Sequence, residues 1–492
     1  MSKLKIGWAE VDITPSEKIN ICGQFYERVS DVVESRLYAT AFALESDNEQ
    51  MIICSCDTAH VAQNLNKMVK ERLKGKLPIS TDKVILCAIH THNSYTYKQV
   101  RTLPMAMNYL KTVLPKDMEY LSNTSGEKAM DEEVALNFLA DKFAEAVLLA
   151  WENRTEGYFQ CAFGRAAVGM CRRVVYDDGI TKMWGETNLS NFSHLEAASD
   201  SGIELIYTFD ENKNVNGVIA NIACPAQVVE QRYFISSDYW GKVKENLEKH
   251  FGRKIFVLGL CSAAGDQCPR DLIRWVEPET PVEDPNIKHI YPVERRADPS
   301  MFDISGLKLV GKRISNEIIS VFEELDLSKM KDQALFVHQT MNMAFPLRKV
   351  TMSEYEDAKA KIEDFIEKNR GKRVTFEENA KLYVYSGIVD RYAIQQKISS
   401  FEEEIHIIRF DDIAIATNPF ELFLDYGNQI RARSRAKQTF LIQLACGCGG
   451  YLPTATAEKG SHYSAYVSSG TTGHEGGELL VSETLDKINK MF

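Results

Sequence analysis

Two histidines separated by one residue, His90 and His92, follow the apolar run Val84–Ile89. Such a run is typical of a buried strand, and active sites of α/β proteins gather at the carboxyl ends of strands. Imidazole is a common zinc ligand at neutral pH, so the pair favours a metal or acid–base site. If the extended backbone continues, the two rings point to opposite faces and serve different roles. A pair of loop histidines without chemistry is the open alternative.

A second segment, Gly259–Arg270, carries small residues in a turn that follows another strand-like run. Small residues allow backbone N–H groups to approach a bound anion or oxyanion. Cys268 lies in this turn, where it could present a reactive thiol. A structural glycine turn with an inert cysteine is the alternative.

A third group of residues lies near the C-terminus. Pro419 predicts a helix that starts just after a strand, with Glu421 in its first turn. Tyr451 and Tyr463 follow the next strand-like run. Taken alone these signals are weak, because a first-turn glutamate usually pairs with the helix dipole and a loop tyrosine usually packs.

Strand-like and helix-like segments alternate along all 492 residues, which predicts an α/β fold of mixed β-sheets layered with α-helices. Asp131, ahead of two glutamates, marks a helix start. Three stretches break the alternation and are predicted as insertions in one domain spanning residues 1–492: about 96–126, 276–300, and 370–401 as a helix plus hairpin. The predicted strands are 5–11, 38–44, 51–56, 83–89, 203–209, 218–224, 254–259, 335–341, 405–410, 413–417 and 439–444, and the predicted helices are 64–73, 131–152, 239–251, 306–325, 352–368, 419–434 and 477–491.

Composition narrows the class of partner. The chain has 58 Lys and Arg against 69 Asp and Glu, a net charge of −11, so the basic surface expected of a nucleic-acid-binding protein is missing. No apolar run is long enough for a membrane span, and no secretory signal is visible. The 11 cysteines, without a Cys-x-x-Cys pair, indicate reduced thiols and a cytoplasmic location. The expected partner is a small-molecule substrate, with no nucleic acid or membrane; homo-oligomer formation is left open.

Taken together, the segments resemble the neutral/alkaline ceramidase family in its N-terminal catalytic domain. The similar pieces keep the family's order over nearly the whole chain: Gly7–Pro15, which ends in Asp-Ile-Thr-Pro, then His90-Thr91-His92, then Ile235–Tyr239, and then Ala264–Pro269. The resemblance implies a ceramidase-like catalytic domain. The family's C-terminal β-sandwich domain has no counterpart in the sequence.

The resemblance also implies a catalytic zinc. His90, Glu421 and Tyr451 match three of its four ligands. His92 and Arg172 match the histidine and arginine that contact the reacting centre.

Two departures bear on this site. Pro225 stands where the family has its second zinc histidine, and a proline side chain has no ligand atom, so the metal dependence is left open. Cys268 replaces a serine of the family. Tyr463 keeps the place of a second family tyrosine.

The leading hypothesis is a hydrolase in which a metal-bound water attacks an amide carbonyl. His92 and Tyr463 would stabilise the oxyanion, and Arg172 would hold a polar part of the substrate. The expected substrate is a small polar amide or related conjugate rather than ceramide.

Two alternatives stay open. One is a glycoside hydrolase on the same scaffold, with Glu421 and Cys268 acting near a zinc–thiolate site that draws on Cys224, Cys446 and Cys448. The other is a metal-free binding protein that lost the catalytic site, which the proline at position 225 favours.

Overall fold

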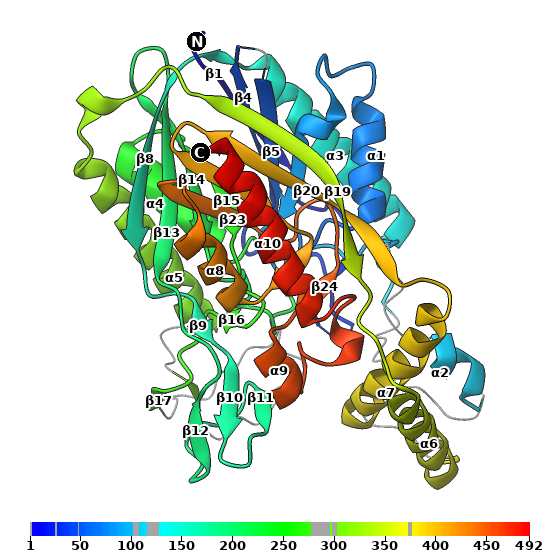
Figure 1. Cartoon of the computed structure of the whole chain (residues 1–492). Coiled ribbons are helices and arrows are strands. Elements are labelled where there is room, and N and C mark those ends of the chain that lie inside the picture. Colours follow the sequence, from blue (N-terminus) through cyan, green and yellow to red (C-terminus); the bar gives the residue numbers. More distant parts are fainter. Residues whose placement is uncertain are drawn as a thin grey trace.

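The computed structural model describes residues 2–24, 27–47, 49–101, 108–115, 127–276, 296–297, 303–371 and 376–492. Three β-sheets face a shared apolar core, and each carries its own pair of helices on the outer face (Figure 1). The predicted fold class, mixed sheets layered with helices, is confirmed.

The first sheet has the strand order β6-β5-β4-β1-β7. Its strands are β1 (Lys5–Asp12), β4 (Tyr38–Ser46), β5 (Glu49–Cys56), β6 (Val84–Ala88) and β7 (Thr155–Glu156). Helices α1 (Gln63–Leu73) and α3 (Glu132–Glu152) bury their apolar faces against it. Asp131 caps α3 by accepting hydrogen bonds from two backbone N–H groups, as its place ahead of two glutamates predicts.

The second sheet has the order β15-β14-β13-β8 and the third the order β19-β20-β21-β23. The second consists of β8 (Tyr158–Arg165), β13 (Gly202–Phe209), β14 (Val215–Ile222) and β15 (Phe256–Cys261), covered by α4 (Tyr239–Phe251) and α5 (Asp303–Glu323). The third consists of β19 (Phe336–Pro346), β20 (Ser400–Phe410), β21 (Ile413–Thr417) and β23 (Gln438–Ile442), covered by α8 (Leu424–Arg433) and α10 (His474–Met491).

The inner faces of all three sheets meet in one cluster that includes Trp8, Phe42, Ile206, Leu258 and Phe440, each at most 4% exposed. Burial of a side chain of this size stabilises the fold by about 1.5–3 kcal/mol relative to leaving it exposed. The cluster therefore fixes the sheets against one another, and with them the loops at their ends.

Each sheet contains one parallel pair, namely β5–β6, β14–β15 and β21–β23. The carboxyl-terminal parts of β6 and β15 are joined by backbone hydrogen bonds to the segment that follows β23. Ala88 donates to Leu444 at 3.3 Å, Gln443 donates to Cys261 at 3.0 Å, and Cys446 donates to Leu86 at 2.8 Å. The three strand ends therefore converge, which is where α/β proteins build their sites.

Short elements continue from these ends. Two small pairs matter for the site: β9 (Met170–Cys171) with β16 (Gln267–Cys268), and β22 (Phe420–Leu422) with β24 (Gly450–Leu452). A third small sheet is formed by β10 (Arg173–Tyr176), β11 (Thr181–Met183) and β12 (Phe192–Leu195). The remaining short elements are β2 (Ile19–Asn20), β3 (Val29–Ser30), β17 (Trp275–Val276), β18 (Arg296–Ala297), α9 (Ala455–Gly460) and the 3₁₀ turns Thr81–Lys83, Leu327–Lys329 and Val467–Ser469.

Two expectations are wrong in detail. The predicted helix 419–434 begins only at Leu424, because residues 420–422 form strand β22 instead. In the predicted helix plus hairpin at 370–401, the described residues form the helix α7 (Phe376–Gln395) and, after a short turn, the start of β20, with no hairpin among them. Most of the predicted excursions 96–126 and 276–300 lies outside the described residues.

Helices α6 (Met352–Lys368) and α7 extend away from the three sheets beside α2 (Asn108–Val113) (Figure 1). They share a small apolar cluster of their own, centred on Leu110, Ile362 and Leu382. This helical unit does not carry any of the predicted site residues.

Candidate functional site

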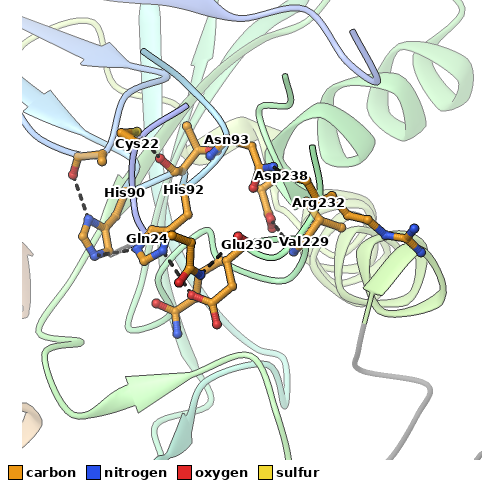
Figure 2. A network of polar contacts seen from close by, with 12 residues as sticks. Cys22, Gln24, His90, His92, Asn93, Val229, Glu230, Arg232 and Asp238 are labelled. Carbon is orange, nitrogen blue, oxygen red and sulfur yellow. Dashed lines mark hydrogen bonds and ion pairs between the residues drawn. The ribbon is translucent and has the colours of Figure 1, made fainter. Parts of the chain in front are cut away.

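His90 and His92 follow β6 as predicted, but the backbone does not stay extended. His90 has a left-handed φ of +67°, so the rings converge instead of pointing to opposite faces, and that expectation is wrong. The ring centroids are 4.8 Å apart and the two Nε2 atoms are 3.3 Å apart (Figure 2). Gly23, itself at φ +92°, makes room, because a Cβ there would lie 2.5 Å from the side chain of His92.

The hydrogen bonding of His90 leaves one ring nitrogen free to bind a cation. Its Nδ1 lies 2.7 Å from the carbonyl oxygen of Ala59 and therefore carries the proton. The bare Nε2 faces Glu421 Oε2 at 3.4 Å. Two acceptors in contact need a cation or a proton between them, and two tetrahedral zinc ligands with bonds of about 2.0–2.2 Å lie roughly 3.3–3.5 Å apart. The pair thus fits a divalent cation.

Strand pairing brings the third predicted ligand to the same place. Glu421 and Tyr451 are direct neighbours in the β22–β24 ladder, and a hydrogen bond joins their side chains. The hydroxyl of Tyr451 lies 3.5 Å from that of Tyr463 and accepts a hydrogen bond from Arg172 Nη2 at 3.2 Å. These contacts link the three predicted ligands to two of the predicted catalytic residues.

Arg172 lies between β9 and β10, which hold its side chain in the interior. It donates to the carbonyl oxygen of Gly265 at 2.9 Å and is 3% exposed. Burial opposes its charge, but Tyr451 and Glu421 outweigh burial and raise the pKa of Arg172, so the guanidinium stays cationic.

Glu230, which the sequence did not single out, lies on the other side of His92. Its Oε2 is 3.1 Å from His92 Nδ1 (Figure 2). Its Oε1 is 3.7 Å from Arg270 Nη2. Nothing in the spacing around residue 230 marks it, because the contact depends on how residues 225–238 fold against the histidine loop. Arg270, which contacts Glu230 from the turn after β16, was not singled out either.

Burial and charge set the protonation of the acidic groups. Burial alone would raise the pKa of Glu421, but the neighbouring His90 and Arg172 lower it to about 2. Burial likewise opposes ionisation of Glu230, yet His92 and Arg270 lower its pKa below the ordinary value. Both carboxylates are therefore ionised at neutral pH. Burial also lowers the pKa of His92, which keeps this imidazole neutral and able to accept a proton.

Some polar atoms at the site have no partner within the described part of the chain. Two of them, Arg172 Nε and Gln227 Nε2, are buried donors. An unpaired buried donor costs about 1–3 kcal/mol, so such atoms are typical of places where a ligand binds. The side chains of His92, Glu230 and Glu421 keep about 13% of their surface accessible, so they are not sealed from solvent.

Cys268 lies next to Arg172, but its thiol is protonated at neutral pH and is therefore a poor nucleophile. It lies in β16, and its Sγ donates to the carbonyl oxygen of Arg270 at 3.4 Å. Burial raises the pKa of the Cys268 thiol to about 12, although Arg172 acts in the opposite direction. The reactive thiolate is the form that the sequence hypothesis needs, and it is not the form present at neutral pH.

The turn around Gly265 is not an anion site. The N–H of Gly265 donates to Leu422 O at 2.8 Å, and the N–H of Ala264 donates to Gln443 Oε1 at 3.1 Å. A Cβ at Gly265 would lie 2.3 Å from the carbonyl oxygen of Glu421. The small residues therefore serve close packing against the strand that carries Glu421, which corrects the oxyanion interpretation.

Pro225 lies in a segment that packs against the histidine loop: Ala226 donates to Ile89 O at 3.4 Å and accepts from the N–H of His92 at 3.3 Å. Residue 225, where the family resemblance places a histidine, therefore lies beside the loop that carries His90 and His92.

The four thiols proposed for a zinc–thiolate cluster are not gathered there. Among the described residues, only one group of three His, Cys, Asp or Glu side chains has its ligand atoms within 4.8 Å of one another, namely Glu404, His406 and Cys446. Cys224 instead donates to Val168 O at 3.4 Å. We call Glu404, His406 and Cys446 the His406 cluster, and His90, His92, Glu230, Glu421, Tyr451, Tyr463 and Arg172 the His90 cluster.

Comparison with known proteins gives a fold and little sequence similarity. No protein-family model matches the sequence, and no curated protein sequence matches it. The structure is similar to that of neutral ceramidase from Pseudomonas aeruginosa, with a TM-score of 0.68 and 15% identity over 99% of this chain and 74% of that one. It is also similar to a ceramidase complexed with C2, with a TM-score of 0.67 and 13% identity over 99% and 75% of the two chains. The chain thus has the ceramidase fold, as the motif order predicted.

No helix within the described residues is both long enough and apolar enough to cross a membrane.

Proposed function

We propose that the chain is a hydrolase that cleaves an amide bond in a small polar substrate with the help of a divalent cation, zinc above all. One observation carries this proposal. The bare Nε2 of His90 faces the ionised carboxylate of Glu421, and the strand ladder sets the hydroxyl of Tyr451 beside that carboxylate. These three residues would hold the cation.

A cation at this place would supply a water of lowered pKa and polarise the carbonyl oxygen of the substrate. His92 accepts the proton of the attacking water at Nε2, because Glu230 faces Nδ1 and fixes the tautomer that leaves Nε2 bare. The guanidinium of Arg172 and the hydroxyl of Tyr463 donate to the oxyanion, where preorganised donors contribute most.

The unpaired donors support a polar substrate. Arg172 Nε and Gln227 Nε2 can donate hydrogen bonds to a carboxylate or carbonyl group on the acyl part of the substrate. A long lipid chain has no comparable support in the described residues of the His90 cluster.

The glycoside alternative has weaker support. Glycoside hydrolysis needs one carboxyl group that is protonated at working pH. Glu421 has a pKa of about 2, and the pKa of Glu230 is also lowered. Neither can serve as the acid, and the buried thiol of Cys268 does not replace the nucleophile.

The test uses the full chain, stripped with chelator and reloaded with zinc, against a panel of N-acyl amino acids and aryl glycosides. We expect release of the free amine from N-acyl substrates only, and only after reloading. Cleavage of glycosides but not amides would contradict the reaction, and equal rates with and without zinc would contradict the cation. Tight substrate binding without turnover would favour the binding-protein alternative.

A further inference from the structure

The His406 cluster lies away from the proposed reaction, on β20 and on the segment that follows β23. Glu404 and His406 are two residues apart in β20, so their side chains lie on the same face of the strand. Cys446 approaches them from the other segment and is 3% exposed, and His406 is fully buried. The cluster shares no residue with the His90 cluster.

A chain of hydrogen bonds fixes the tautomer of His406. His338 Nδ1 lies 3.0 Å from the carbonyl oxygen of Gln50 and therefore carries a proton. Its Nε2 is then an acceptor, 2.9 Å from His406 Nδ1. His406 accordingly carries its proton on Nδ1 and presents a bare Nε2.

That bare nitrogen faces two further electron-pair donors. Glu404 Oε1 lies 2.8 Å from His406 Nε2, and Cys446 Sγ lies 3.6 Å from it. The thiol of Cys446 can donate its proton to Nε2, but the ionised carboxylate cannot, so the 2.8 Å contact sets two acceptors against each other. A cation that replaces the thiol proton would bind all three atoms. A histidine that binds a metal through one ring nitrogen commonly donates its other N–H to an acceptor that is itself held by a hydrogen bond. His406 donates to His338 in this way, and His338 is held by the carbonyl oxygen of Gln50.

The spacing decides which cation fits. With Zn–N bonds of about 2.0–2.1 Å and Zn–S bonds of about 2.3 Å, tetrahedral ligands lie roughly 3.6 Å apart, which matches the separation of Nε2 and Sγ. The carboxylate is closer than a zinc ligand would be, and the 21% exposed side chain of Glu404 has room to shift by about 0.5 Å. Thiolate and imidazole together select zinc-class ions over Mg²⁺ or Ca²⁺.

Lys70 is the rival for the carboxylate, since its Nζ lies 2.5 Å and 2.6 Å from the two oxygens of Glu404. It satisfies the carboxylate, whereas the donor that faces the Nε2 of His406 is the thiol of Cys446 at 3.6 Å, and that thiol proton is the one a bound cation would replace. A divalent ion bound by one carboxylate and one thiolate has no net charge, so Lys70 can stay beside it. A second proton on His406 would instead put two like charges next to each other in the interior.

We infer that Glu404, His406 and Cys446 form a second metal site that binds a zinc-class divalent cation. Binding forms bonds from the cation to Nε2, Oε1 and Sγ, and the thiol proton of Cys446 is released to solvent. The fourth position is filled by water or by a shifted neighbouring group. The inference does not depend on the proposed hydrolase function.

Such an ion would cross-link β20, which carries Glu404 and His406, to the segment before β24, which carries Cys446. Cys446 lies five residues before Tyr451, and its backbone N–H already bonds Leu86 of β6. The cation would therefore secure the loop that positions one of the proposed ligands of the His90 cluster, and would act on stability rather than on the reaction.

Cobalt substitution tests the site directly, because a thiolate ligand gives an intense sulfur-to-cobalt absorption band that nitrogen and oxygen ligands do not give. The chelated full chain is loaded with Co²⁺ as the original protein, as Cys446→Ser and as the matched control Cys448→Ser from the same buried loop. We expect the band in the original protein and in Cys448→Ser, and its loss in Cys446→Ser. Absence of the band from the original protein would overturn the inference without any variant, as would a band that survives Cys446→Ser.

Zinc counting separates this site from the hydrolase site. We expect two zinc per chain after reloading, and one in His406→Gln with amide hydrolysis retained. His90→Ala should also retain one zinc, together with the full cobalt band. If the His90 cluster binds no zinc, the original protein still carries one with the thiolate band, and the second site stands. A zinc content unchanged by His406→Gln would refute it.

Discussion

The His90 and His406 clusters have the same kind of core, an imidazole with one bare nitrogen against a carboxylate, but different surroundings. At the His90 cluster two donors, Arg172 Nε and Gln227 Nε2, lack partners within the described chain. At the His406 cluster His338 pairs with His406 and Lys70 pairs with Glu404, so both side chains already have protein partners. Open shells with spare donors are typical of catalytic metal sites, and closed shells with a thiolate are typical of structural ones.

The first prediction tests this division of labour. His90→Ala should lower amide hydrolysis about a thousandfold or more, because loss of the cation removes several kcal/mol of transition-state stabilisation. His406→Gln should leave the rate within about threefold if its site is structural. Steady-state kinetics on zinc-loaded protein measures both; equal losses in the two variants would break the comparison.

The second prediction tests whether Arg172 of the His90 cluster takes part in the reaction. We expect Arg172→Gln to lower kcat by about 10²–10³, the usual loss for a donor to a developing oxyanion. The control is Arg431→Gln, a part-buried arginine that pairs with Asp200 and is not part of the cluster. If both variants lose the same activity and the same stability, Arg172 acts through the fold.

A third region, around Glu10, contains no residue of either cluster and predicts how the stability of the fold depends on acid pH. Burial would raise the pKa of Glu10, but Lys244 and Lys254 outweigh burial and lower it to about 2. The depressed pKa means that the ion pairs stabilise the protein fully above the unfolded-state value of 4.5 and progressively less as pH falls to about 2. The loss should reach about 2–3 kcal/mol of unfolding free energy.

Urea unfolding of the chelated protein between these pH values measures this loss. Glu10→Gln should be less stable at neutral pH and should show a flatter acid dependence. An unchanged slope in the variant would assign the acid sensitivity to other carboxylates, including those of the two clusters.

The two tyrosines distinguish holding the cation from contacting the substrate. Tyr463→Phe should lower kcat about 10–100-fold with zinc content unchanged, because one positioned hydroxyl is lost. Tyr451→Phe should instead weaken zinc binding, visible as a higher zinc concentration for half activity. Zinc loss in Tyr463→Phe would exchange the two roles.

The smallest effect is expected at Cys268. Its thiol is buried and protonated at neutral pH, so Cys268→Ser should leave the rate within about twofold and change stability by about 1 kcal/mol. Thermal unfolding and kinetics check this. A large drop in kcat with an intact fold would restore the thiol as a reacting group and extend the reactive region beyond the His90 cluster.

Local sequence signals predicted many of the elements but missed others, such as strand β8 (Tyr158–Arg165), and long-range pairing decided the site. The alternation of apolar runs predicted Tyr239–Phe251, Met352–Lys368 and Ile413–Thr417 to the residue. Glu421 was predicted on a helix because Pro419 is a good first helical residue, but the ladder with Tyr451, thirty positions later, holds residues 420–422 as a strand. Propensity does not contain that pairing.

The histidine loop shows the same limit. His-x-His after a strand was visible, but the left-handed backbone at His90 that turns the rings together depends on tertiary contacts. Glu230 has no motif at all and joins the site only because its segment packs beside His92. The His406 cluster was equally hidden, since Cys446 comes from a segment forty residues beyond His406.

Anomalous X-ray scattering at the zinc edge, on crystals of the reloaded protein, tests the central claim most directly. The account predicts a peak within bonding distance of His90 Nε2 and Glu421 Oε2, beside the hydroxyl of Tyr451. A crystal with full zinc occupancy at the His406 cluster and no anomalous density between His90 and Glu421 would contradict it.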